Sequence, residues 1–116
     1  GDPVVLNLQA NACGMSINFD IAVTSDQFDW NQPGVKLCAR DQFTKAPYEL
    51  GAVNAANGRA ALDSASTAIK TVLDGKAVAV VAAPQNQKSI ALTGVDFDGY
   101  PFFVARETGL APEDVF

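Results

Sequence analysis

The stretch Ala77-Val78-Ala79-Val80-Val81-Ala82-Ala83 is apolar throughout, and Pro84 follows it directly. A run without polar alternation is typical of a strand that is buried on both faces, and such strands belong mainly to parallel sheets covered by helices. Ligands bind in open α/β sheets beyond the carboxyl ends of the strands. We therefore expect an α/β fold with a mostly parallel sheet flanked by helices, and a ligand cleft just after Ala83.

A long helix is predicted before this strand, over residues 57–74. Its apolar residues recur at helical spacing: Leu62, Ala65, Ile69, Val72 and Leu73. Gly75 follows as the helix-ending residue, because the left-handed conformation costs glycine no Cβ clash. After the strand, shorter helices are predicted over residues 86–92 and 102–108, and residues 112–114 resemble the opening turn of another helix.

Three short strands are predicted in the first fifty residues, which are broken by turns. Residues 4–8 are β-branched and apolar, and residues 35–39 follow a turn that contains Pro and Gly. Residues 16–23 alternate, which predicts one buried face. That face would carry Ile17, Phe19, Ile21 and Val23. No linker divides the chain, so we expect residues 1–116 to form a single α/β domain or part of one.

The composition excludes several classes of partner and mechanism. With 8 Lys and Arg against 13 Asp and Glu, the chain has a net charge of −5. It therefore lacks the counterion release that drives nucleic-acid binding, and its sign disfavours anionic lipid. The chain contains no histidine. By itself it therefore lacks the side chain needed for His-dependent nucleophilic catalysis and for zinc sites with imidazole ligands. The expected partner is a small-molecule substrate, with neither nucleic acid nor membrane.

The two cysteines, Cys13 and Cys38, have small or apolar neighbours. They could form one disulfide, but this setting favours two free, buried thiols. No apolar run reaches transmembrane length and no signal peptide is visible, so a cytoplasmic location is expected. A mature chain whose signal had been removed would look the same.

The segment at the predicted cleft is Pro84-Gln85-Asn86-Gln87-Lys88. Its amides can hydrogen-bond a ligand, and the Lys88 ammonium at a helix start can meet an anion. Alternatively, Asn86 caps the helix and Lys88 is solvated, since asparagine is a strong N-cap residue. Tyr100 can line a pocket, although aromatic residues after a turn more often belong to the core. Asp96-Phe97-Asp98-Gly99 lacks the further oxygen ligands of a calcium loop, so the residues predict no metal site.

Several segments occur in an order that is found in a known family. They are Asn54-Ala55-Ala56-Asn57-Gly58-Arg59-Ala60, the long helix, Val80-Val81-Ala82-Ala83-Pro84, Leu92-Thr93-Gly94-Val95, Gly99 and Ala105-Arg106-Glu107-Thr108-Gly109. This ordered set resembles the 4-hydroxythreonine-4-phosphate dehydrogenase family, which takes part in pyridoxal phosphate biosynthesis. The family has relatives that act on other hydroxy acids and dihydrodiols. The resemblance is best over residues 51–109.

The resemblance implies a two-domain α/β fold related to the isocitrate and isopropylmalate dehydrogenases. It also implies an oxidoreductase that uses NAD or NADP and a divalent metal, acts on a hydroxy acid or a diol, and forms a homodimer. The family's metal-binding histidines lie beyond the matched region, so the isolated chain is expected to be inactive. An alternative from another class is a non-catalytic α/β ligand-binding or interaction module derived from that family.

Two departures from the family concern the substrate site. The family's substrate-binding His-Thr pair follows a glycine, and the corresponding residues here are Tyr100 and Pro101. The family's lysine after an asparagine corresponds to Gln87, with Lys88 one place later. The resemblance thus implies an altered substrate, for example one that lacks the phosphate. The substrate-binding residues that it implies are Tyr100, Pro101, Asn86, Gln87 and Lys88.

Overall fold

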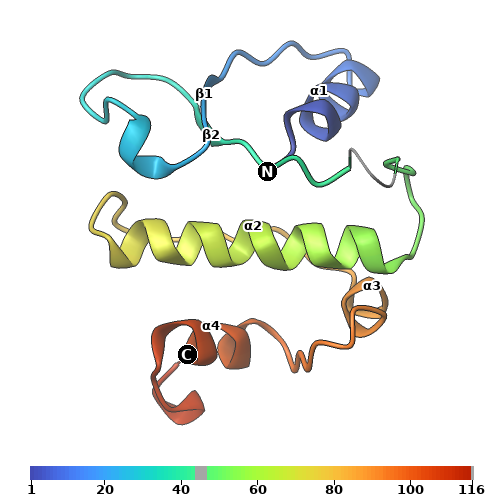
Figure 1. Cartoon of the computed structure of the whole chain (residues 1–116), viewed down its shortest axis with the longest axis vertical. Coiled ribbons are helices and arrows are strands. Elements are labelled where there is room, and N and C mark those ends of the chain that lie inside the picture. Colours follow the sequence, from blue (N-terminus) through green and yellow to red (C-terminus); the bar gives the residue numbers. More distant parts are fainter. Residues whose placement is uncertain (44–46, 116) are drawn as a thin grey trace. The chain divides into compact units, whose positions relative to one another are not determined.

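Two compact units make up the chain, Gly1–Glu49 and Leu50–Phe116. The computed structural model describes residues 1–43 and 47–115, and Figure 1 shows its helices and strands. The boundary between the units coincides with a change in composition near residue 50, from strand-like sequence to Ala-rich sequence with helical spacing. Among the described residues, both units contain helices, and the strands lie in the first unit.

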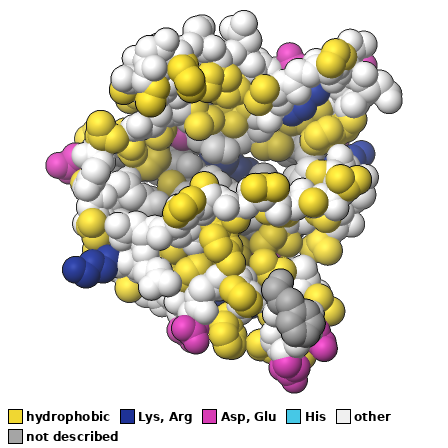
Figure 2. Space-filling model, turned by 180° about the vertical axis from the view of Figure 1, so that it is seen from behind, with side chains coloured by type: hydrophobic (Ala, Val, Ile, Leu, Met, Phe, Trp, Pro, Cys, Tyr) yellow, Lys and Arg dark blue, Asp and Glu magenta, His cyan; other side chains and the backbone are white. Residues whose placement is uncertain are grey.

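Few side chains in the described residues are fully buried. The buried hydrophobic residues are Ala10, Leu37, Leu62, Ile69, Ile90, Phe103 and Ala105. Many valine and leucine side chains are exposed instead, and Figure 2 shows hydrophobic side chains at the surface.

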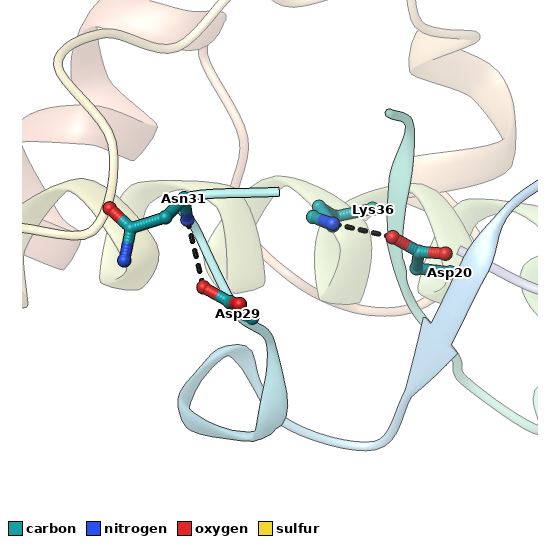
Figure 3. Close-up of polar contacts among 4 residues, drawn as sticks. All are labelled: Asp20, Asp29, Asn31 and Lys36. Carbon is teal, nitrogen blue, oxygen red and sulfur yellow. Dashed lines mark hydrogen bonds and ion pairs between the residues drawn. The ribbon is translucent and has the colours of Figure 1, made fainter. Parts of the chain in front are cut away.

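The first unit combines a helix with a pair of short parallel strands. Its elements are α1 (Pro3–Ala12), β1 (Asp20–Ala22), a 3-10 turn (Ser25–Gln27) and β2 (Lys36–Cys38). Lys36 donates to Asp20 across the first pair of opposed residues in the sheet (Figure 3). Between the strands, the Asp29 carboxylate accepts a hydrogen bond from the backbone N–H of Asn31 at 3.0 Å, which closes a turn.

The strand predicted over residues 4–8 is wrong, because these residues lie in α1. The start of the helix explains the difference. The Asp2 carboxylate accepts hydrogen bonds from the N–H groups of Val4 and Val5, at 2.9 and 3.4 Å, and Pro3 occupies the first turn. An N-cap followed by proline is a strong helix-start signal, and it prevails here over the β propensity of valine.

The other two strand predictions had different outcomes. Residues 35–39 contain β2, as predicted. Of residues 16–23, only Asp20–Ala22 form a strand, and Ile21 and Val23 on the predicted inner face are 57% and 61% exposed. A three-residue strand with one neighbour buries little of either face, so the alternation overestimated both its length and its burial.

The second unit is helical in its described residues. Its elements are α2 (Ala55–Leu73), α3 (Gln87–Ala91), α4 (Tyr100–Thr108) and a 3-10 turn (Pro112–Asp114), which confirms the predicted helices. The Asn54 side chain caps α2 by accepting a hydrogen bond from Asn57 N at 2.8 Å, and Gly75, with a φ of 69°, follows its end. α2 packs against α3 and α4 around a shared core of Leu62, Ile69, Ile90 and Phe103.

Residues 77–83 do not form the predicted buried strand. They run back along α2 toward α3 without regular structure, as the trace in Figure 1 shows, and Val78 and Val81 are fully exposed. A strand needs a hydrogen-bonded neighbour. The described residues of the second unit contain no other strand. The apolar segment therefore stays unpaired and without regular structure.

The fold class is α/β, as predicted, and the sheet in the described residues is a parallel pair of strands. In the same residues, no helix combines the length and the hydropathy needed to cross a membrane. Cys13 and Cys38 are free, as predicted, but the expected burial of both is wrong. Cys13 caps the C-terminal end of α1, where its side chain is exposed, and Cys38 is half-buried in β2.

Candidate functional site

A groove of about 470 Å³ lies in the second unit between α2, residues 80–85 and α4. Its walls are almost entirely apolar. The apolar residues are Ala61, Ala65, Ala68 and Ile69 of α2, residues 80–84, and Val104 of α4. A volume of this size suits a small organic ligand or the side chains of a docked segment.

Three polar side chains reach this groove, and two of them are already engaged. The Tyr100 hydroxyl donates to the carbonyl oxygen of Ala83 at 2.8 Å, and the Ser64 hydroxyl donates to that of Ala60 at 2.8 Å. The Gln85 side-chain oxygen is buried and has no hydrogen-bond partner within the described part of the chain. Burying a hydrogen-bond acceptor without a partner costs folding free energy. An occupant of the groove that donates a hydrogen bond to the Gln85 side-chain oxygen would remove this cost.

Tyr100 is the titrating group of the groove. Burial raises the pKa of its phenol above the ordinary value of 10.0, because desolvation disfavours the phenolate. At neutral pH the hydroxyl is therefore protonated and remains the donor to Ala83. The Tyr100 side chain thus links α4 to residues 80–85 by a hydrogen bond.

Tyr100→Phe is expected to destabilise the chain by at most about 1 kcal/mol below pH 10, because one partly exposed hydrogen bond is lost. A raised folded-state pKa contributes stability that is complete below the unfolded value and is lost as the pH rises through the folded value. The midpoint of thermal unfolding should therefore fall above pH 10, and it should fall further for the wild type than for Tyr100→Phe. Tyr48→Phe, which removes the other tyrosine, is the control. Parallel pH dependence of wild type and Tyr100→Phe would contradict this role.

The five residues predicted to bind substrate are not gathered at the groove. Tyr100 lines it, whereas Gln87 and Lys88 are exposed in the first turn of α3 and Pro101 is exposed in the first turn of α4. Asn86 Oδ1 accepts from Ser89 N at 2.9 Å, so the capping alternative is confirmed for this residue. Substrate binding by the five stays a prediction.

The sequence-based list of site residues omitted Ser64 and Gln85. Gln85 belongs to the segment predicted to lie at the cleft, but nothing in the sequence distinguishes its buried amide from the amides of its neighbours. A signal for the α2 wall was present in the sequence, because Ala61, Ser64, Ala65 and Ala68 repeat at helical spacing and form a face of small residues. Small side chains leave room beside a helix, which is why the groove opens there.

The residues present do not fit a metal site. Across residues 1–43 and 47–115, no three His, Cys, Asp or Glu side chains are close enough together to hold a metal ion, and the chain contains no histidine. Divalent metals in enzymes need several such ligands at once. The divalent metal implied by the family resemblance therefore has no ligand set in the described part of this chain.

Comparison with known proteins identifies relatives of the whole chain. The 4-hydroxythreonine-4-phosphate dehydrogenase of Methylococcus capsulatus is 32% identical over 114 residues, which is 97% of this chain and 34% of that protein. The enzyme of the same name from Burkholderia vietnamiensis is 38% identical over 108 residues, 93% of this chain and 29% of that protein. The 1,2-dihydroxy-3,5-cyclohexadiene-1,4-dicarboxylate dehydrogenase of a Comamonas species is 31% identical over 70 residues, 60% of this chain and 22% of that protein.

The chain thus spans about a third or less of the length of these curated relatives. No solved structure matches it significantly. The sequence profile of one family, described as the pyridoxal phosphate biosynthetic protein PdxA, matches residues 1–115 and so extends well beyond the best-matching stretch of residues 51–109. On this match over nearly its entire length, the chain belongs to the PdxA family.

Proposed function

We propose that this chain is the substrate-side part of an NAD(P)-dependent dehydrogenase that acts on a hydroxy acid or a diol. The observation that carries the proposal is the family match over residues 1–115. The relatives are named as dehydrogenases of 4-hydroxythreonine-4-phosphate and of 1,2-dihydroxy-3,5-cyclohexadiene-1,4-dicarboxylate. Both names describe hydroxyl-bearing compounds with anionic groups, and oxidation of such a hydroxyl requires a hydride acceptor.

In this proposal, the nucleotide and the metal bind outside these 116 residues. The described residues lack a metal-ligand cluster, and the sequence has no glycine-rich dinucleotide fingerprint. The chain supplies substrate contacts and is inactive by itself. The complete enzyme would be a cytoplasmic homodimer with the two-domain α/β fold related to the isocitrate and isopropylmalate dehydrogenases.

The proposed substrate wall consists of Asn86, Gln87, Lys88, Tyr100 and Pro101. Lys88 is the cation of this set and is exposed on α3, so it would meet an anionic group of the substrate. Tyr100 has its hydroxyl engaged by Ala83, so its ring would contact the carbon skeleton. A phenol ring supplies no positive charge, which supports a substrate without a phosphate at that position.

A chimera tests the proposed reaction. Residues 1–115 of this chain replace the matching third of the Methylococcus capsulatus relative. The chimera is assayed with NAD or NADP and a divalent metal, on 4-hydroxythreonine-4-phosphate and on unphosphorylated hydroxy acids and diols. We expect nucleotide reduction by the chimera and none by the isolated chain. A folded chimera that oxidises neither kind of substrate overturns the proposed dehydrogenase reaction. Turnover by the isolated chain overturns the proposal that the nucleotide and the metal bind outside these 116 residues.

Lys88→Ala in this chimera is expected to raise KM for an anionic substrate by about 10- to 100-fold, because a charge-assisted hydrogen bond is lost. The fold should be unchanged, since Lys88 is exposed. Lys70→Ala removes an exposed lysine of α2 and should leave KM unaltered. Equal KM values for the Lys88 and Lys70 variants would remove Lys88 from the substrate wall.

A further inference from the structure

The polar side chains of the groove present hydrogen-bond acceptors to an occupant. The hydroxyls of Ser64 and Tyr100 each have one proton, and both protons are used, on Ala60 O and Ala83 O. A hydroxyl whose proton is used can accept a further hydrogen bond but cannot donate one. The Gln85 side-chain oxygen is a third acceptor, and it has no partner among the described residues. A ligand that donates a hydrogen bond therefore matches all three oxygens.

The Gln85 side-chain oxygen is the acceptor that gains most from a ligand, because it is buried and unpaired. Apart from the hydroxyls of Ser64 and Tyr100, the groove around it has apolar side chains. An ordered water needs about two to four polar partners, which apolar walls do not provide. A ligand can donate to this oxygen while its carbon skeleton covers the walls.

The charge of the groove restricts the ligand further. None of the described residues that line it is Lys, Arg, Asp or Glu. An unpaired charge is costly in apolar surroundings, so the ligand is expected to be neutral. The names of the relatives' substrates contain a phosphate or a dicarboxylate. The groove therefore suits a compound other than the anionic substrate proposed above, and this inference does not depend on that reaction.

The size of the groove sets the size of the ligand. An apolar cavity of about 150 Å³ holds one benzene molecule. The groove has a volume of about 470 Å³, so two fused rings fit within it. One of its walls is the face of small residues on α2, to which Ala61, Ala65 and Ala68 belong. Small side chains allow a planar ring to lie close to the helix.

We propose that the groove binds a neutral, mainly apolar alcohol or phenol of about two rings, whose hydroxyl donates a hydrogen bond to the Gln85 side-chain oxygen. A ketone or an ether of the same size has no proton to donate and leaves that oxygen unpaired. The affinity comes from the apolar surface that is buried, and the hydrogen bond to Gln85 selects the alcohol.

A peptide segment, from a second copy of the chain or from another protein, is a poorer occupant. Each of its residues carries a backbone donor and a backbone acceptor, and both need partners when they are buried. The hydroxyl protons of Ser64 and Tyr100 are already used and cannot serve a peptide carbonyl. A small molecule with a single hydroxyl brings no such unmatched groups into the groove.

Calorimetric titration of the 116-residue chain with three matched probes tests the proposal. The probes are 1-(2-naphthyl)ethanol, the ketone 2-acetonaphthone and the carboxylate 2-naphthoate. The alcohol and the ketone share a carbon skeleton, but only the alcohol donates a hydrogen bond. We expect a Kd below about 1 mM for the alcohol. The ketone should bind at least about 10-fold more weakly, and the carboxylate should not bind measurably.

Three variants locate the binding site. Gln85→Leu removes the acceptor and keeps a side chain of similar size, so it should weaken alcohol binding about 10-fold and leave ketone binding within about twofold. Gln32→Leu, at an exposed position of the first unit, is the matched control and should change neither affinity. Ala68→Leu fills the groove from α2 and should weaken both ligands by more than about 10-fold.

The stability of Gln85→Leu without ligand gives a second readout. Because the change removes a buried acceptor that has no partner, its thermal midpoint should be at least as high as that of the wild type. This variant therefore remains informative even if Ala68→Leu does not fold. A lower midpoint would mean that the Gln85 oxygen is already satisfied, which overturns the proposal.

The titrations can overturn the proposal in several ways. Ketone binding as tight as alcohol binding excludes donation to Gln85, and so does a preference for the alcohol that persists in Gln85→Leu. Binding of the carboxylate as tight as that of the alcohol contradicts a neutral ligand. If the alcohol does not bind and the chain self-associates as its concentration rises, a second copy is the occupant. An inactive chimera counts against the proposed reaction alone, because these affinities are measured on the 116-residue chain.

Discussion

Gly58→Ala is expected to destabilise the chain by about 3 kcal/mol, because it forces an extra methyl group into a closed contact. A Cβ atom at Gly58 would lie 2.1 Å from Ser89 O and 2.8 Å from Ile90 N. Both are backbone atoms of α3, which cannot move aside as the end of a flexible side chain can. The contact between α2 and α3 therefore exists because residue 58 has no side chain.

Whether Gly58→Ala lowers or raises stability distinguishes the packing of residue 58 from its helix propensity. In a helix without tertiary contacts, alanine in place of glycine stabilises by about 1 kcal/mol. Urea unfolding of wild type and variant measures the difference. Asp63→Ala, at an exposed position of α2, serves as the control and should change stability by less than about 0.5 kcal/mol. Equal or greater stability of the Gly58 variant would mean that α3 does not pack at this point of α2.

Ile90→Ala is expected to cost about 2–5 kcal/mol, the range for truncating a large aliphatic side chain in a closed core. Ile90 is 0% exposed and packs in the cluster with Leu62, Ile69 and Phe103. The change removes apolar contacts and leaves a cavity that α3 can fill only by moving. The midpoint and slope of urea unfolding report the loss.

Two control variants set the scale for the loss of stability in Ile90→Ala. Ile90→Val removes one methylene and should cost about 1 kcal/mol. Leu92→Ala truncates an exposed side chain close to α3, and its effect should stay below about 0.5 kcal/mol. A loss for Ile90→Ala no larger than that of Leu92→Ala would place Ile90 outside the core.

Both variants also bear on the proposed substrate wall. α3 has only five residues, far fewer than an isolated helix needs in water. Its position depends on the Gly58 contact, the burial of Ile90 and the cap from Asn86. Displacing α3 would move Lys88 with it, so losses of stability in these variants should be accompanied by weaker substrate binding in the chimera.

The helices of the second unit were predictable because their signals are local. Apolar spacing along α2, the Asn54 and Asn86 caps, and Gly75 after α2 act within a few residues of the backbone they stabilise. The same kind of signal was present at Asp2 and Pro3, where β propensity was given more weight and the predicted strand was wrong. Local rules thus sufficed for helix positions when capping was weighed before propensity.

The candidate site was predictable only in part. Tyr100 was considered both as a pocket-lining residue and as a core residue, and it lines the groove. Asn86 was recognised as a possible cap, and it caps α3. The hydrogen bond from Tyr100 to Ala83 joins residues that are far apart in the sequence. The burial of the Gln85 side-chain oxygen also depends on the tertiary structure. Such contacts depend on how α2 and α4 pack, which spacing along one segment does not specify.

The amino-acid order alone was enough for the α/β class, the three helices of the second unit and kinship with the PdxA family. Pairing and burial depended on tertiary contacts: β1 pairs with β2 over three residues, whereas residues 77–83 are as apolar as any strand and pair with nothing in the described chain. The physical reason is that a helix satisfies its backbone within its own segment, while a strand must receive hydrogen bonds from another one.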